Sequence, residues 1–132
     1  MGKKVYEIMN TKLETISSDA SVYDAIEKLI DKRIRSLLVV PKKQEEEYGI
    51  ITIRDIIFKV LEKNLDPQKV KVYEIASKPI ITVDKDTSIE EILRLMTKNN
   101  IARVFVKDKE KIIGLVSFFD VLYSILIERA KR

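Results

Sequence analysis

Apolar residues along the chain recur with two different periods, one typical of helices and one typical of buried strands. After Ser21, apolar positions three and four residues apart predict a helix that ends near Lys32. Ser21, with Asp24 three residues later, is a typical signal for the start of that helix. The same spacing predicts a short helical turn at 5–9, and a brief run predicts an extended segment at 13–16.

Two continuous apolar runs separated by polar residues predict a hairpin after this helix. The runs occupy 35–41 and 48–51, and the polar turn between them spans 42–47. A second helix is expected from Asp55 to about Leu65. This half of the chain therefore consists of a leading helical turn followed by the order β-α-β-β-α.

The second half of the sequence repeats this order almost position by position. Val72–Ile75 repeats Val5–Ile8 at a displacement of 67 residues, and the helix signal at Ser88 repeats the one at Ser21. A shorter turn in the second hairpin reduces the displacement to 65 residues by Gly114. A register kept over this length indicates a true internal repeat.

The duplication predicts both the fold class and the division of the chain. Internal repeats of this size indicate two like units that pack about a pseudo-twofold axis. We therefore predict an α/β fold made of two β-α-β-β-α repeats. The first repeat should occupy 1–65, the linker 66–71 and the second repeat 72–132.

One seven-residue motif occurs in both halves, where a predicted strand meets a predicted helix. It reads glycine, two aliphatic residues, threonine or serine, two further residues and aspartate, at 49–55 and again at 114–120. The first N–H groups of a helix have no partner within the helix and carry the positive end of its dipole, so this junction suits a phosphate. The alternative is structural, because Thr52 and Asp55 also fit a capping box. The two interpretations are compatible.

The composition excludes much of enzyme chemistry. Among 132 residues there is no cysteine and no histidine, which excludes disulfides, thiolate nucleophiles, Cys/His zinc sites and imidazole bases. The consecutive glutamates at 45–47 lie on a polar turn and do not converge, so we expect no metal site. An enzyme would depend on Asp or Lys chemistry, for which no convergent group is visible. We predict no catalytic activity.

Charge and hydropathy indicate a soluble, cytoplasmic protein. The net charge is +4, from 25 basic and 21 acidic residues. This excess is mild and spread along the chain, which indicates a solvated surface rather than a nucleic-acid interface. No apolar run approaches the roughly 18–20 residues of a membrane span, and the first residues lack the apolar core of a signal peptide. A charged fraction of 35%, rich in Lys and Glu, fits a thermophile's surface.

Taken together, these features resemble a tandem pair of cystathionine-β-synthase (CBS) domains, also called a Bateman module. The resemblance covers about 5–126 and is carried by the leading helical turn, the β-α-β-β-α order and the doubled motif. It implies clefts between the repeats that bind an adenosine-containing ligand: AMP, ADP, ATP or S-adenosylmethionine. It implies no further cofactor. In this family the hydroxyl residue of the motif meets phosphate and the aspartate accepts hydrogen bonds from the ribose hydroxyls, a role that suits an acceptor-only carboxylate.

The resemblance assigns ligand-binding positions in both repeats. Thr52 and Asp55 would serve one cleft, and Ser117 and Asp120 the other. Aliphatic residues of the motif would flank the adenine, and residues of each first strand would offer backbone groups to the base edge. These further positions are Ile50, Leu115, Thr15, Ile16, Thr82 and Val83.

Arginines distinguish the two sites in this comparison. Arg103 matches a position where nucleotide-binding members of the family often carry a basic residue, and the resemblance pairs it with Thr52 and Asp55 across the repeats. The first repeat has Ser36 at that position and Arg35 one place earlier, on the opposite face of a regular strand. The resemblance therefore implies that the Ser117 site is the weaker phosphate site, although Arg54 and Arg35 are alternative cations for the first repeat. For each arginine, a solvated surface role remains the alternative.

We therefore expect a non-catalytic module that senses adenine nucleotide and signals ligand state to a regulated partner protein. The apolar content of the helices after both motifs exceeds what one buried face needs, which predicts an isologous homodimer. Two other functions stay open from the sequence. A structural dimerisation scaffold would bind no ligand, and a nucleic-acid-binding module would show strong salt dependence.

Overall fold

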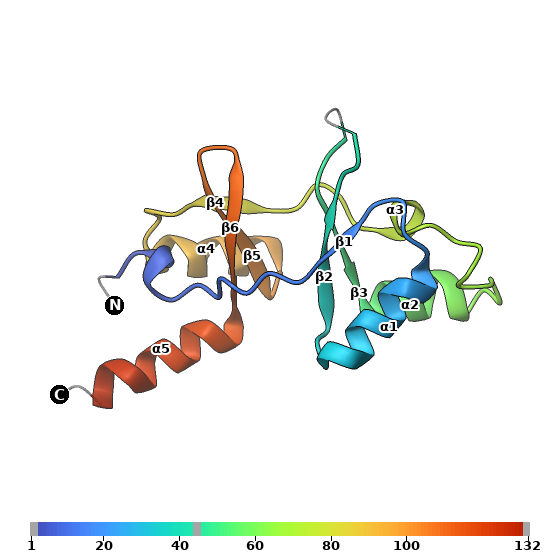
Figure 1. The fold of residues 1–132 in the computed structure, drawn as a ribbon. Coiled ribbons are helices and arrows are strands. Elements are labelled where there is room, and N and C mark those ends of the chain that lie inside the picture. The colour runs from blue at the N-terminus through green and yellow to red at the C-terminus, as the bar shows by residue number, and fades with distance from the viewer. Residues whose placement is uncertain (1–2, 44–45, 131–132) are drawn as a thin grey trace. The chain divides into compact units, whose positions relative to one another are not determined.

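The computed structural model describes residues 3–43 and 46–130. The chain forms two compact units, each with its own three-stranded sheet (Figure 1). We call Glu14–Ile80 the first-repeat unit; the second-repeat unit combines Met1–Leu13 with Ile81–Arg132. The predicted α/β class and the β-α-β-β-α order of both repeats are confirmed.

Each unit contains the strands and helices of one β-α-β-β-α repeat and one short helical turn. The first-repeat unit consists of β1 (Thr15–Ser17), α1 (Val22–Lys32), β2 (Ser36–Val40), β3 (Gly49–Thr52), α2 (Ile53–Ile56), the π-helix η2 (Ile57–Leu61) and α3 (Val72–Ile75). The second-repeat unit consists of the 3-10 helix η1 (Val5–Glu7), β4 (Thr82–Asp84), α4 (Ile89–Asn99), β5 (Arg103–Asp108), β6 (Lys111–Ser117) and α5 (Phe118–Ala130). The polar turn predicted at 42–47 includes Gln44 and Glu45, which lie outside the described residues.

The long helices α1 and α4 begin where the local signals predict. The hydroxyl oxygen of Ser21 accepts a hydrogen bond from the Asp24 N–H at 3.0 Å, and Ser88 accepts one from the Glu91 N–H at 3.2 Å. Both helices end at a residue with positive φ, a usual way to stop a helix. These confirmed boundaries follow from local chemistry alone.

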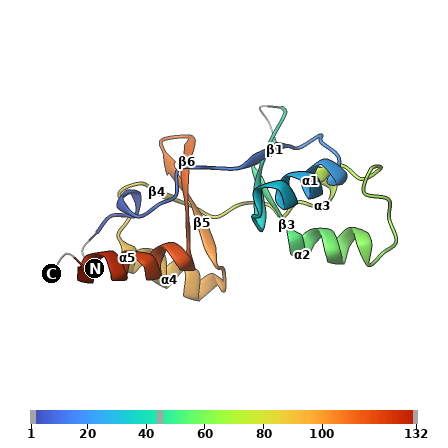
Figure 2. The same ribbon diagram turned by 60° about the horizontal axis from the view of Figure 1, so that its bottom comes forward.

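In both sheets the second strand is central, parallel to the first strand and antiparallel to the third. In the first-repeat unit, α1 and α2 pack side by side (Figures 1 and 2). Leu29 of α1 and Ile56 of α2 belong to one core with Leu37 and Val39 of β2. Each sheet therefore has its own hydrophobic core, which fixes the strand ends that carry the doubled motif.

The leading helical turns are exchanged between the repeats. Val5, from the first repeat, is fully buried in the second-repeat unit, where its N–H donates to the Thr87 carbonyl at 2.7 Å. Val72, from the second repeat, is fully buried in the first-repeat unit, where its N–H donates to the Ala20 carbonyl at 2.8 Å. Each folded unit therefore contains the leading helical turn of the other sequence repeat.

The glycine of the motif makes room for the segment that follows each exchanged turn. The backbones of Leu115 and Asn10 form a β-bridge beside Gly114, and a Cβ at Gly114 would lie 2.5 Å from the Met9 sulfur. Gly49 is also closely packed, although less tightly, since a Cβ there would lie 3.1 Å from the Ser77 carbonyl oxygen. The glycines thus have a packing role that the sequence pattern did not identify.

The expected helix after the first motif needs correction. The first of these helices begins at Ile53, two residues before Asp55, and continues as a π-helix from Ile57 to Leu61 instead of one α-helix to Leu65. The reason is that Thr52 is the N-cap, which puts Asp55 at the third helical position. Several aromatic side chains are at least 47% exposed in the single chain: Tyr6, Tyr73, Phe58, Phe118 and Tyr123.

Replacing Gly114 by alanine should lower the free energy of unfolding by about 1 kcal/mol, because the methionine side chain must move away from the new methyl group. Urea denaturation would measure the change. The Met9→Ala background is the matched control, since it removes the atoms nearest the new methyl group. An equal loss in both backgrounds would show that the sulfur contact is not the cause.

Candidate functional site

The register of each sheet brings the predicted ligand positions to one edge. Thr15 pairs with Leu38 on the parallel strand β2, and Ser36 pairs with Thr52 on the antiparallel strand β3. The amino ends of β1 and β2 and the carboxyl end of β3 therefore share an edge. In the second-repeat unit the same edge carries Thr82, Arg103 and Ser117 at the corresponding strand ends, followed by Asp120.

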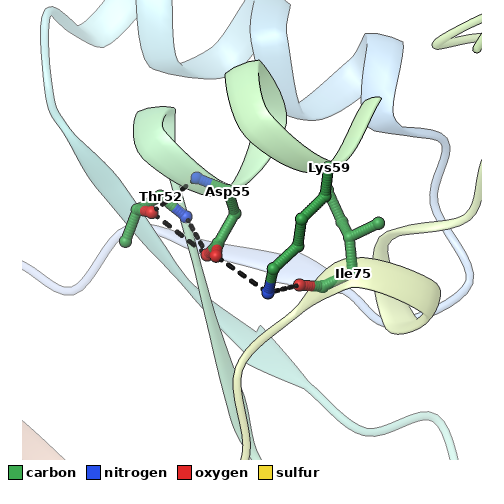
Figure 3. A network of polar contacts seen from close by, with 4 residues as sticks. All are labelled: Thr52, Asp55, Lys59 and Ile75. Atoms are coloured by element: carbon green, nitrogen blue, oxygen red, sulfur yellow. Dashed lines mark hydrogen bonds and ion pairs between the residues drawn. The ribbon is translucent and has the colours of Figure 1, made fainter. Parts of the chain in front are cut away.

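Asp55 is held by a network that is part cap and part ion pair (Figure 3). Its Oδ2 accepts hydrogen bonds from the N–H and the hydroxyl of Thr52, both at 3.0 Å, and its own N–H donates to the Thr52 hydroxyl at 3.0 Å. Its Oδ1 lies 3.0 Å from the Lys59 ammonium. The residue is only 9% exposed, so this carboxylate is largely removed from water and is balanced by an adjacent positive charge.

Lys59 connects this aspartate to helix α3. The same ammonium donates a hydrogen bond to the carbonyl oxygen of Ile75 at 2.9 Å, at the last residue of α3 (Figure 3). Two acceptors therefore hold Nζ at once, while the side chain remains 43% exposed. The sequence interpretation did not include Lys59; the available signal was its position four residues after Asp55 on the same helix.

Asp120 has the same cap without the lysine. Its Oδ2 accepts hydrogen bonds from the N–H of Ser117 at 2.8 Å and from the Ser117 hydroxyl at 3.0 Å. Ser124 occupies the position that corresponds to Lys59, and its hydroxyl donates to the Val121 carbonyl at 2.6 Å. In the part of the chain that the structure describes, the hydrogen bonds to the Asp120 carboxylate come from Ser117, and no lysine takes the place of Lys59.

A second lysine, Lys28, is hydrogen-bonded to Thr15, a first-strand residue that is predicted to contact the edge of the adenine base. The Lys28 ammonium donates to the carbonyl oxygen of Thr15 at 2.6 Å and lies 3.9 Å from the Glu14 carboxylate. The corresponding position in the second repeat is Leu95, which has no donor to offer the Thr82 carbonyl. Ile16 and Val83, the neighbouring predicted contacts, are half-buried in their first strands.

The predicted adenine-flanking residues are tied to the exchanged segments by their backbones. Ile50 exchanges two hydrogen bonds with Ser77, at 3.0 and 2.9 Å, and Leu115 exchanges two with Asn10, at 3.0 and 2.8 Å. Both side chains are half-buried. The exchanged segments thus fix the backbone of each motif one residue after its glycine.

The three arginines lie in different surroundings. Arg103 is directly opposite Ser117 in the antiparallel pair, within the second-repeat unit; its predicted pairing with Thr52 stays a prediction. Arg35 is exposed, and its backbone carbonyl accepts a hydrogen bond from the Ile53 N–H at 3.1 Å. The Arg54 guanidinium stacks over Phe58, 4.9 Å from the ring centroid, a cation–π contact on an exposed helix face.

The chain belongs to the CBS domain family, whose model matches 5–62 and 72–127. An uncharacterized protein of Methanocaldococcus jannaschii is 35% identical over 108 residues, which cover 81% of this chain and 58% of that protein. The inosine-5′-monophosphate dehydrogenase of the same organism is 31% identical over 121 residues, which cover 91% of this chain and 23% of the enzyme. This chain spans about three fifths of the first curated relatives it matches.

Solved structures show the same fold. The hexameric CBS-CP12 protein from bloom-forming cyanobacteria superposes with a TM-score of 0.83 at 34% sequence identity, covering 100% of this chain and 78% of that one. In the part of the chain described here, no helix has the length and apolar character needed to cross a membrane. Among the same residues, no three acidic, histidine or cysteine side chains gather as metal ligands.

Replacing Asp55 by alanine should destabilise the protein more than replacing Asp120. We expect a loss of about 2–3 kcal/mol for Asp55→Ala, because it removes the cap and leaves Lys59 without its counter-ion, and about 1 kcal/mol for Asp120→Ala, which removes a cap alone. Equilibrium urea denaturation of both variants would measure the difference. Equal losses, or a larger loss at Asp120, would contradict a stabilising role for the lysine pair.

Proposed function

We propose that this CBS pair is a non-catalytic regulatory module that binds an adenosine-containing ligand and signals its presence to a partner protein. The observation that carries the proposal is the duplication of one polar arrangement. In both units a hydroxyl residue and an aspartate meet at the start of a helix, at the same edge of the sheet, in a chain of the CBS family.

The chemistry of this arrangement suits a nucleoside with vicinal hydroxyls. A carboxylate is an acceptor with room for several hydrogen bonds, so Asp55 and Asp120 can receive ribose hydroxyls. The Thr52 and Ser117 hydroxyls stand beside the first N–H groups of their helices, where a phosphate oxygen is favoured. The candidate ligands are AMP, ADP, ATP and S-adenosylmethionine, in clefts between the repeats, with Arg103 supplying charge to the Thr52 site.

A regulatory role fits the size of the matched region in a larger relative. The match to inosine-5′-monophosphate dehydrogenase covers 23% of that enzyme, so the module corresponds to a minor part of a catalytic chain. We propose that this protein acts on a partner, in the cytoplasm, and has no activity of its own. A mild net charge of +4 gives little support to a nucleic-acid function.

Assembly with a second copy is part of the proposal. Helix α5 exposes large apolar side chains along most of its length; among them Phe119 is 71%, Leu126 66% and Leu122 64% exposed. Exposed apolar surface on this scale is typical of an interface. We propose a homodimer, and the same surface is the observation that favours the second candidate, a structural dimerisation scaffold that binds no ligand.

A thermal-shift panel of AMP, ADP, ATP, S-adenosylmethionine, NAD and GTP would test ligand binding. A ligand at about a hundred times its Kd adds roughly 2.7 kcal/mol to the free energy of unfolding, which raises the Tm of a domain of this size by several degrees. We expect such a shift with adenosine-containing ligands, and a smaller shift in Arg103→Ala for those that carry phosphate.

Asp55→Asn and Asp120→Asn, and the two combined, are the matched variants for the panel. Each ligand-induced shift is compared with the same variant's own ligand-free Tm, which separates lost binding from lost capping. We expect the combined variant to show no shift. A wild-type protein that responds to none of the six compounds would leave the scaffold as the function.

A further inference from the structure

Two lysines of the first repeat occupy acceptor groups that the proposed function assigns to the ligand. Lys59 lies 3.0 Å from Oδ1 of Asp55, and Lys28 donates to the Thr15 carbonyl at 2.6 Å. The second repeat has Ser124 and Leu95 at the corresponding positions. The two candidate sites therefore share their caps but differ in how much acceptor capacity is already used.

Counting acceptor positions on the two carboxylates gives this difference a chemical meaning. A carboxylate offers about four lone-pair positions. Counting partners among residues 3–43 and 46–130, Asp55 uses three, two for Thr52 and one for Lys59, whereas Asp120 uses two, both for Ser117. A ribose 2′,3′-diol donates two hydrogen bonds. Asp120 can accept both without rearrangement, but Asp55 can accept both only if the lysine or the Thr52 hydroxyl gives up its position.

Lys59 is held more firmly than an ordinary surface lysine. Its ammonium also donates to the Ile75 carbonyl at 2.9 Å, and its partner Asp55 has a side chain that is only 11% exposed. Hydrogen bonds to charged groups with little access to water are stronger than exposed pairs, which contribute little. Displacing the lysine from Asp55 therefore lowers the affinity for a ligand that needs that oxygen.

We propose that Lys59 gates the first-repeat site against the ribose diol, so that a nucleoside without phosphate binds first at Asp120. The inference rests on the proposed function and names the residue that makes the two sites unequal. Lys59 is a positioning residue here: it acts through Asp55. Arg103 is a separate influence, because it concerns phosphate, whereas the lysine concerns the sugar.

Adenosine is the probe that isolates this effect, because it carries no phosphate to attract Lys59 or to draw the Thr52 hydroxyl away. Asp120→Asn leaves the first-repeat aspartate as the intact acceptor, and Asp55→Asn leaves the second. Adding Lys59→Met to Asp120→Asn keeps the aliphatic stem but removes the ammonium. Adding Ser124→Lys to Asp55→Asn introduces the lysine four residues after Asp120. Isothermal titration calorimetry would measure adenosine binding to each protein.

We expect Lys59→Met to tighten adenosine binding at the first-repeat site about tenfold, and Ser124→Lys to weaken it at the second by a similar factor. Binding of 2′,3′-dideoxyadenosine, which lacks the diol, should change in neither pair. Lys63→Met is the control for loss of a positive charge, since Lys63 is exposed on the same segment. Lys59→Gln keeps a hydrogen-bond donor for the Ile75 carbonyl but removes the charge, and it should also tighten adenosine binding. This second variant keeps the test valid if Lys59→Met does not fold.

The results separate this inference from the proposed function. If adenosine binds but Lys59→Met and Lys59→Gln leave its affinity unchanged or lower it, the gate is wrong and the binding function stands. If the dideoxy compound gains as much affinity as adenosine, the lysine acts on something other than the diol, and the gate is again overturned. If neither adenosine nor any nucleotide of the thermal-shift panel binds the wild-type protein, both proposals fail together.

Discussion

The backbone N–H groups at the start of α2 and α5 impose the constraint on which the rest of this structure depends. These groups have no partner inside their helices and must find one outside. Thr52 with Asp55, and Ser117 with Asp120, meet that need at the point where the third strand of each sheet becomes a helix. Because the cap joins strand to helix directly, it also fixes where the carboxylate lies relative to the sheet edge.

Because of this constraint, the residues of the motif alone cannot distinguish a helix cap from a ligand-binding site. An aspartate that uses one oxygen for a cap still presents its other oxygen, and that second oxygen is where the two repeats differ. In one it meets Lys59, and in the other the corresponding residue is Ser124. The two repeats thus share the part of the motif that caps the helix and differ at the residue that faces the second oxygen.

Local signals explain how much of the fold could be predicted from the sequence. Helices α1 and α4 begin after Ser21 and Ser88 because a serine hydroxyl caps each of them, and the hairpins follow from apolar runs separated by polar turns. The positions assigned to the sites do gather at the edge of each sheet, since strand register follows from the same runs. Their binding roles stay predictions.

What the sequence could not reveal depends on contacts between distant residues. Val5 and Val72 lie in nearly identical local sequences, so no local pattern indicates which core each of them enters. The confinement of Gly114 by Met9 is also invisible until the chain is folded. The bridge from Lys59 to Ile75 joins residues sixteen positions apart, and only its first half, the spacing to Asp55, could be read along a helix.

The exchange of the leading helical turns has a consequence for the order of events during synthesis. Glu14–Ile80 is one uninterrupted segment that contains every part of its own core, including Val72. The other unit needs two distant segments of the chain, because Val5 fills a core whose other buried members lie between Ile89 and Val121. On a ribosome, domains fold as they emerge. The first-repeat unit can therefore complete its fold while Val5 remains exposed, because the residues that bury Val5 have not yet been synthesised.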